Sequence, residues 1–99
     1  MGVVNTVFAS ATNGNTTFGS DAELIVGGTF VGTVKLQVQI PDGSGAAVWC
    51  DVGSLTAPGV LNYRGTVGRT FRAICSAFTS GTIITSVGAA LNEEMFQTP

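Results

Sequence analysis

The sequence predicts an all-β protein: an antiparallel β-sandwich of about seven or eight short strands, immunoglobulin-like or jelly-roll-like. Residues 34–40 alternate apolar and polar over seven positions, which is the period of a strand with one buried face. Clusters of Gly, Asn, Ser and Pro separate further short β-prone segments along the chain. The middle of the chain shows no helical periodicity flanked by capping residues.

The first half of the chain contains three expected strands. Residues 3–9 are rich in Val and Phe, and the pair Asn13-Gly14 that follows favours a turn. Residues 17–26 form the second expected strand, with an irregular middle at Gly19-Ser20 because glycine weakens a strand interior. After a glycine pair, residues 29–40 form the longest expected strand.

The second half of the chain contains shorter expected strands. Residues 41–45 predict a loop, because proline presets the turn backbone and glycine accepts positive φ. Residues 47–52 follow as a strand that carries the only Trp of the chain. After a turn, residues 60–63 form a short strand, residues 69–78 alternate clearly, and residues 82–90 form the last strand after another turn.

Side chains that share a parity within each strand predict the core. The expected core residues are Leu24, Val34, Leu36, Val38, Trp49, Phe71, Cys75, Ile83 and Val87. An inward Trp49 would match the buried strand Trp of immunoglobulin-type sandwiches. Cys50 would then point outward while Cys75 points inward, and a disulfide between them would be geometrically awkward. We therefore expect free thiols.

The composition indicates a surface suited to association. Charged residues make up 10% of the chain, against about 25% in an ordinary soluble domain. A surface with few charges is weakly protected from contact with other molecules, as expected for a subunit of a dense assembly. The net charge of −2 and the pI of about 4.6 argue against a nucleic-acid partner, because phosphate binding needs clustered Lys and Arg.

The residues that most enzymes use are scarce in this chain. It contains no His and two Cys, which excludes Ser-His-Asp and Cys-His catalysis and the common zinc sites. Gly-rich phosphate-binding motifs are also missing. We therefore expect no enzymatic activity, no cofactor and no metal. No segment matches a signal peptide or the ~20 apolar residues of a membrane span, so we expect a protein made in the cytoplasm with no membrane partner.

Three segments organise the chain: an N-terminal arm or first strand at residues 1–15, a β-sandwich domain at 16–91 and a C-terminal tail at 92–99. Ile74 and Ile84 are expected to point outward on neighbouring strands and to form one exposed patch, unless a loop or the N-terminal segment covers them. The candidate interface residues are Val3, Val4, Val7, Phe8, Ile74, Ile84, Met95 and Phe96. Deleting residues 1–9 or 92–99 is expected to weaken association without unfolding the domain.

Four short motifs resemble a known family. They are Gly28-Thr29-Phe30-Val31-Gly32-Thr33-Val34-Lys35-Leu36-Gln37 with its following Asp-Gly loop, Trp49-Cys50-Asp51-Val52, Phe71-Arg72-Ala73-Ile74-Cys75 and Thr79-Ser80-Gly81-Thr82. Together they are similar to small virion proteins of tailed bacteriophages that have an immunoglobulin-like β-sandwich. The similarity covers residues 24–88, and the loop before Trp49 is longer here than in the usual form.

The resemblance implies a structural virion component, with no catalytic or ligand-binding residues. The expected function is that of a capsid decoration (cement) protein on the virion surface. Its partners would be the major capsid protein and further copies of itself, as a homotrimer by analogy with other cement proteins. The alternative is a tail, fibre or surface carbohydrate-binding module for host attachment. In that alternative Trp49 is exposed and stacks on a sugar, while Asp42 or Asp51 hydrogen-bonds its hydroxyl groups.

Overall fold

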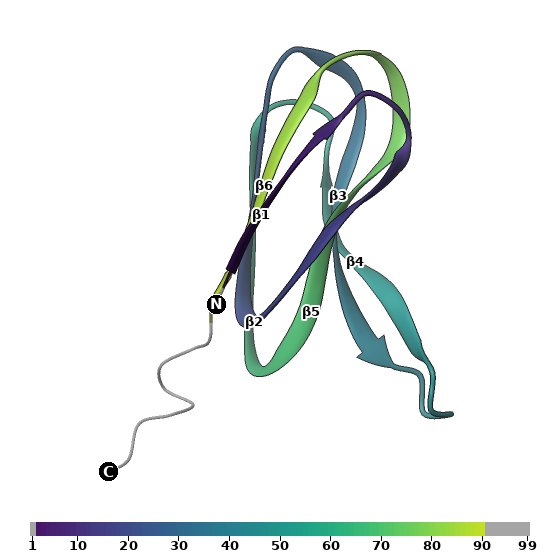
Figure 1. Ribbon diagram of the computed structural model, residues 1–99, viewed down its shortest axis with the longest axis vertical. Helices are drawn as coiled ribbons and strands as arrows, with labels where there is room; N and C mark the ends of the chain where they lie inside the picture. The colour runs from purple at the N-terminus through teal and green to yellow at the C-terminus, as the bar shows by residue number, and fades with distance from the viewer. Residues whose placement is uncertain (1, 91–99) are drawn as a thin grey trace.

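The computed structural model describes residues 2–90, and all the regular secondary structure of this part is β (Figure 1). The strands are β1 (Gly2–Phe8), β2 (Thr12–Gly27), β3 (Phe30–Pro41), β4 (Ala47–Leu55), β5 (Gly59–Gly81) and β6 (Ile83–Ala90). They form one hydrogen-bonded antiparallel sheet in the order β1-β6-β2-β5-β3-β4. The predicted all-β antiparallel class is therefore confirmed.

The predicted strand count is wrong, because the described chain has six strands rather than seven or eight. Two expected breaks lie inside long strands. Asn13-Gly14 belongs to β2, and the expected strands at residues 60–63 and 69–78 are parts of β5. Gly14 allows a close approach instead of a turn, since an added Cβ would lie 2.6 Å from the carbonyl oxygen of Ala73. Because the hydrogen bonds form a single sheet, the two separate sheets of a sandwich are not confirmed.

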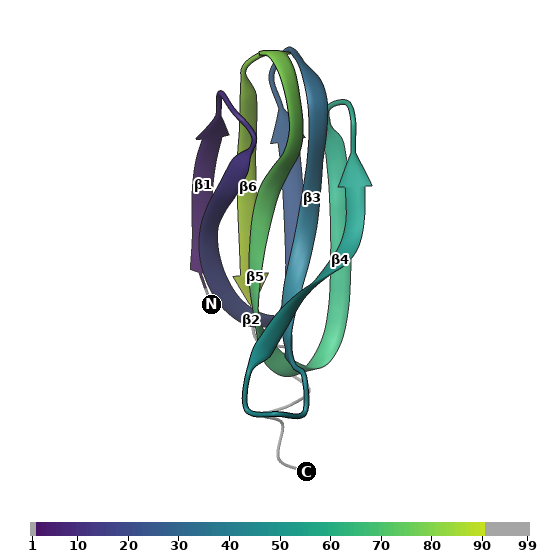
Figure 2. The same ribbon diagram turned by 90° about the vertical axis from the view of Figure 1, so that its right-hand side faces the viewer.

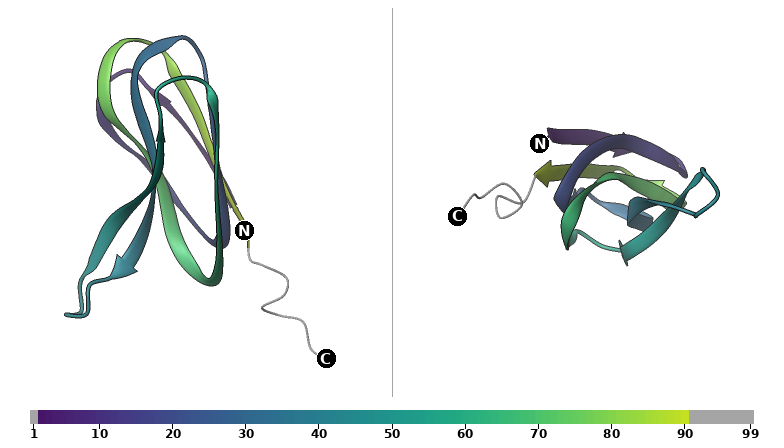
Figure 3. Two further views of the ribbon diagram at one scale, coloured as in Figure 1. Left: turned by 180° about the vertical axis from the view of Figure 1, so that it is seen from behind. Right: turned by 90° about the horizontal axis from the view of Figure 1, so that it is seen from below.

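The sheet bends sharply where the register between β2 and β5 shifts. Gly19 pairs with Arg69 and Asp21 pairs with Arg64, so Ser20 alone on β2 faces residues 65–68 on β5. The longer segment of β5 arches outward at this level, at the bottom of Figure 2 and of the left panel of Figure 3. A bulge of this kind increases the bend of a strand pair. The long strands β2 and β5 therefore continue from one half of the sheet into the other.

The bend divides the sheet into two halves that face each other (Figure 1). The first half-sheet consists of β1, β6, residues 21–27 of β2 and residues 59–64 of β5. The second half-sheet consists of residues 12–19 of β2, residues 69–81 of β5, β3 and β4. The ring of Tyr63 in the first half-sheet packs against Phe71 in the second, with 5.0 Å between the ring centroids.

A single core lies between the two half-sheets. Its buried apolar residues are Phe8, Ala22, Leu24, Val26, Val34, Leu36, Val38, Phe71, Ala73, Cys75, Ile83, Val87 and Ala89. Every residue predicted for the core is buried except Trp49. Alternation along each strand thus identified the inward side chains correctly in β2, β3, β5 and β6.

The predicted orientation of Trp49 and Cys50 is wrong. Trp49 pairs with Gln39 and Cys50 with the buried Val38, so Cys50 packs against the core and Trp49 lies on the outer side. Both cysteines are free thiols, as expected, but for a different reason. Cys50 and Cys75 pair with β3 at Val38 and Val34, positions that lie about 13 Å apart along the strand.

The N-terminal residues form a strand of the sheet. All seven residues of β1 pair with β6, and Phe8 at its end is 1% exposed. The prediction that Phe8 belongs to an interface is therefore wrong, because this ring is one of the largest core side chains. The sequence left open an arm or a first strand, and the structure shows the strand. Deleting residues 1–9 would uncover the core, so the expectation of an intact domain after that deletion is withdrawn.

Candidate functional site

The outward side of the first half-sheet carries several exposed apolar side chains among polar ones; we call it the first outer face. Its exposed large apolar residues are Val3 (65% exposed), Val7 (63%), Ile84 (53%), Val60 (51%) and Ile25 (45%). The strand registers place them in neighbouring rows: Val7 is opposite Ile84, and Ile25 is opposite both Ser86 and Val60. Exposed apolar patches on soluble proteins often mark contact surfaces.

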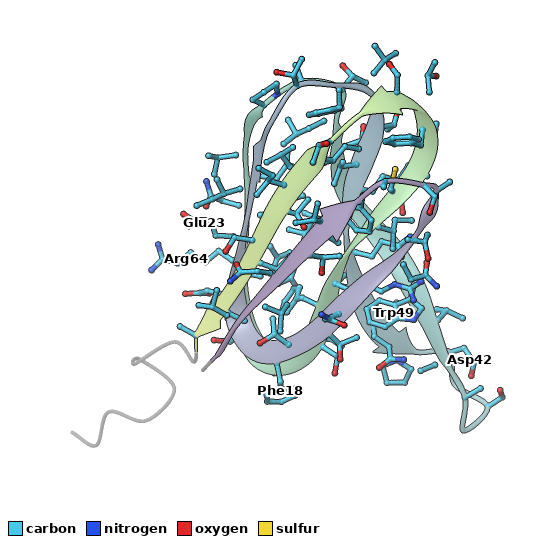
Figure 4. The ribbon with its side chains drawn as sticks, turned by 45° about the horizontal axis from the view of Figure 1, so that its top comes forward. Phe18, Glu23, Asp42, Trp49 and Arg64 are labelled. Atoms are coloured by element: carbon cyan, nitrogen blue, oxygen red, sulfur yellow. The ribbon has the colours of Figure 1, made fainter. Side chains whose placement is uncertain are left out.

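A shallow hollow of about 610 Å³ lies on the first outer face, at the end nearest the bend. It exists because Gly88 presents no side chain between Val3 and Glu23, its neighbours on β1 and β2. The charged residues of the hollow are Asp21, Glu23 and Arg64. The Asp21 carboxylate accepts a hydrogen bond from the Gly65 amide at 3.2 Å, and Glu23 and Arg64 project outward in Figure 4.

The outward side of the second half-sheet, the second outer face, carries a polar ladder. The Lys35 ammonium lies 3.1 Å from Asp51 Oδ2, and Gln37 Nε2 donates to Asp51 Oδ1 at 2.8 Å. Arg72 Nε donates to Gln37 Oε1 at 3.0 Å, and its guanidinium carbon lies 4.1 Å from the centroid of the Trp49 ring. Because Gln37 faces Asp51 on β4 and Arg72 on β5, the pleat itself brings these groups together.

The ladder stabilises the ionised form of Asp51. The hydrogen bond from Gln37, and then the contacts with Lys35, hold the pKa of Asp51 below its ordinary value of 3.8. Burial lowers the pKa of Arg72, which nevertheless stays protonated at neutral pH. Within residues 2–90, every buried polar side-chain atom has a hydrogen-bond partner. The ladder is therefore a satisfied and preorganised network that holds the ring of Trp49 in place.

The β3-β4 hairpin projects beyond the body of the sheet (Figures 1 and 2). The pairing of β3 with β5 ends at Val38, whereas its pairing with β4 continues to Pro41. At the tip, Ser44 donates from its amide and from its hydroxyl to Asp42 Oδ1, both at 2.7 Å. These bonds lower the pKa of Asp42, and they commit its carboxylate to the turn rather than to a ligand.

A groove of about 470 Å³ separates the projecting hairpin from the bend; we call it the hairpin groove. Its lining consists of Phe18, Gln39, Ile40, Pro41, Gly45, Ala46, Ala47, Gly68, Arg69 and Thr70. Phe18 is 53% exposed, and its ring lies across Gly68, where an added Cβ would collide with it. Because Gly68 has no side chain, the ring of Phe18 packs directly over this residue at the surface; Figure 4 labels Phe18.

The candidate interface residues are dispersed over the molecule. Val3, Val7 and Ile84 lie on the first outer face, whereas Val4 is half-buried against the core. Ile74 is half-buried on the second half-sheet, opposite Lys35. The predicted joint patch of Ile74 and Ile84 does not form, because β5 and β6 are consecutive in the chain but are not neighbours in the sheet. Met95 and Phe96 lie outside the described residues.

Sequence reasoning missed several surface residues. Ile25 lies between Leu24 and Val26, both predicted or found in the core, so the alternation of β2 already placed Ile25 outside. Phe18 carried no comparable signal, because it lies next to the bend between Gly19 and Asp21. The stacking of Arg72 on Trp49 was missed because Trp49 was assigned to the core.

Nothing in residues 2–90 groups three or more His, Cys, Asp or Glu side chains in a way that could hold a metal ion. The same part of the chain has no helix that is long and apolar enough to cross a membrane. The comparisons with known proteins do not place the chain in a family. No protein-family model matches the chain, and a search of curated proteins finds no match.

Proposed function

We propose that the protein is a non-enzymatic structural component of a bacteriophage virion, a decoration protein that binds the capsid surface and stabilises it. The first outer face is the observation that carries this proposal, because it presents five large apolar side chains on neighbouring strands of one sheet. The low charge of the chain and the motifs shared with small virion proteins support the same conclusion. The partners are the major capsid protein and further copies of this chain, which is made in the host cytoplasm.

The size of the first outer face favours a multivalent attachment. Complete burial of a Val or Ile side chain contributes about 1.5–3 kcal/mol, so a half-exposed one contributes roughly 1 kcal/mol. Five such side chains would give roughly 5 kcal/mol, which is comparable with the cost of immobilising one subunit. A single copy would therefore bind weakly. Several linked copies, such as a trimer, would gain the missing affinity through a high effective concentration.

A charge placed on the first outer face tests the proposal. Val7→Lys combined with Ile84→Lys puts two ammonium groups on the face at positions where the side chains do not contribute to the core. We expect the variant to keep its thermal unfolding temperature and to lose binding to purified phage shells in co-sedimentation. Val31→Lys is the matched control, since Val31 is 58% exposed on β3. Wild-type occupancy of the double variant on the shells would contradict the proposal.

The second candidate function, carbohydrate binding for host attachment from a tail, fibre or surface position, rests on Trp49. This side chain is half-buried on the outer side of β4, with Arg72 over its ring and Asp51 and Gln37 one row away. A Trp ring beside fixed polar groups is a suitable stacking surface for a sugar. Trp49 emission titrated with glycans tests this function. A saturable change that Asp51→Asn weakens, in a protein that does not bind shells, would favour it over decoration.

A further inference from the structure

The hairpin groove combines one positive charge with an apolar lining. Arg69 is the only charged residue among the described residues that line it. The structure shows no ion pair for Arg69 within residues 2–90. Around Arg69 the groove presents the ring of Phe18 and the side chains of Ile40 and Ala47. A complementary occupant would carry carboxylates next to large apolar side chains.

The described part of the chain ends near one of the strands that line this groove, on the inner side of that strand. Ala90 lies against Gly19: a Cβ added at Gly19 would be 2.8 Å from the Ala90 nitrogen and 2.9 Å from its oxygen. Gly19 follows Phe18 on β2 and pairs with Arg69 on β5. The next nine residues of the chain therefore start next to the strands that form one wall of the groove. In an extended conformation they could span about 30 Å.

The sequence of residues 91–99 has the complementary chemistry. It contains Glu93 and Glu94, no basic residue, and then Met95 and Phe96. In the sequence the two carboxylates, Glu93 and Glu94, precede Met95 and Phe96, so the acidic part of the segment is the nearer to Ala90. From this match we propose that the hairpin groove is the docking site of this chain's own C-terminal segment, residues 91–99.

Electrostatics favours this groove over the other hollow that Ala90 borders. The hollow on the first outer face carries Asp21 and Glu23 against a single Arg64, so it has an excess of negative charge. Glu93 and Glu94 would be repelled there and attracted by Arg69 in the hairpin groove. The attraction is exposed to solvent and weakens with added salt, since the screening length is about 10 Å at 0.1 M. The docking is independent of the function proposed above.

Nuclear Overhauser measurements on the full chain test the docking. We expect cross-peaks between the ring protons of Phe18 and the side chains of Met95 and Phe96. Arg69→Glu should remove them, and Arg69→Glu combined with Glu93→Lys and Glu94→Lys should restore them. Arg64→Glu is the matched control, because it makes the same charge change at the other hollow and should leave the cross-peaks in place. Glu93→Lys with Glu94→Lys alone changes no described residue and should also remove them.

Three results would overturn the proposal. The first is the absence of the cross-peaks in the wild-type chain at low salt. The second is their appearance only between differently labelled copies in a mixed sample, which would assign the occupant to a second molecule. The third is an equal loss in Arg64→Glu and Arg69→Glu, which would show a general charge effect. The methyl signals of Leu24 and Leu36 report in each variant that the core is intact.

Discussion

The two outer faces are parts of one sheet and share the strands β2 and β5, yet their side chains differ in kind. The first outer face presents exposed Val and Ile side chains on neighbouring strands, with polar residues beside them and, among the described residues 2–90, no hydrogen-bonded side-chain network. On the second, Lys35, Asp51, Gln37, Arg72 and Trp49 contact one another across three strands. The comparison shows how one backbone arrangement can leave one surface free for association while the other stabilises the strand register.

The largest expected effect comes from the core that both faces cover. Leu24 in the first half-sheet and Leu36 in the second are both 0% exposed. Replacing either with Ala should lower the free energy of unfolding by about 2–5 kcal/mol, because a cavity remains. Denaturant unfolding measures the loss, and Lys35→Ala should change it by less than about 1 kcal/mol. A much smaller loss for one Leu would mean that the half-sheets do not share a core.

A smaller effect is expected on the second outer face. Gln37→Ala removes the link between Asp51 and Arg72, and Gln37 is 9% exposed. We expect a loss of about 0.5–1.5 kcal/mol, the net contribution of an intramolecular hydrogen bond, because water can solvate the partly exposed partners. Trp49 emission should shift at the same time, since Arg72 would no longer be held over the ring. An unchanged emission and an unchanged stability would show that the ladder is incidental.

The ladder also predicts a pH dependence. The folded pKa of Asp51 lies below its unfolded value, so its ionisation contributes stability above the ordinary value of 3.8. That contribution is lost as the pH falls through the folded pKa. Unfolding experiments between pH 7 and pH 2 should therefore show a steeper acid loss in the wild type than in Asp51→Asn. Parallel curves for the two proteins would contradict the assignment of the shift to Gln37 and Lys35.

The smallest effect is expected on the first outer face. Val7→Ser removes an apolar side chain that is 63% exposed and lies outside the core cluster. The free energy of unfolding should change by no more than about 0.5 kcal/mol. The change should appear instead in self-association, which analytical ultracentrifugation of concentrated protein measures. A loss of several kcal/mol would show that the first outer face contributes to folding as the second does.

The sequence predicted most strands and most core residues because alternation is a local property. Leu24, Leu36 and Phe71 each lie in a segment where one parity is clearly more apolar than the other. Residues 47–52 are different, since Val48, Cys50 and Val52 alternate with Ala47, Trp49 and Asp51. Because Trp49 is large and apolar, it was predicted to point into the core together with Ala47 and Asp51, and this assignment of the inward side was wrong. Asp51 on the same side was the available sign that this side faces water.

The long-range features could not be predicted from local patterns. Glycines at positions 65 and 68 resemble a break between strands, but β5 continues through them and bends. The bend depends on pairing with β2, which is distant in the sequence. For the same reason Ile74 and Ile84 were assigned to one patch, whereas the sheet order separates β5 from β6. The hairpin groove could not be predicted either, because its lining residues come from β2, β5 and the β3-β4 hairpin, which are distant in the sequence.

The continuity of β2 and β5 through the bend has a consequence for folding cooperativity. Because β2 and β5 run through both half-sheets, opening them in one half-sheet disturbs their pairing in the other. Thr12 pairs with Cys75 and Gly2 with Ala89, so the backbone hydrogen bonds of the sheet join segments that are far apart in the chain. Such topologies fold slowly and lack independent substructures. Amide protons of the central strands in both half-sheets should therefore exchange with water only through one global opening of the molecule.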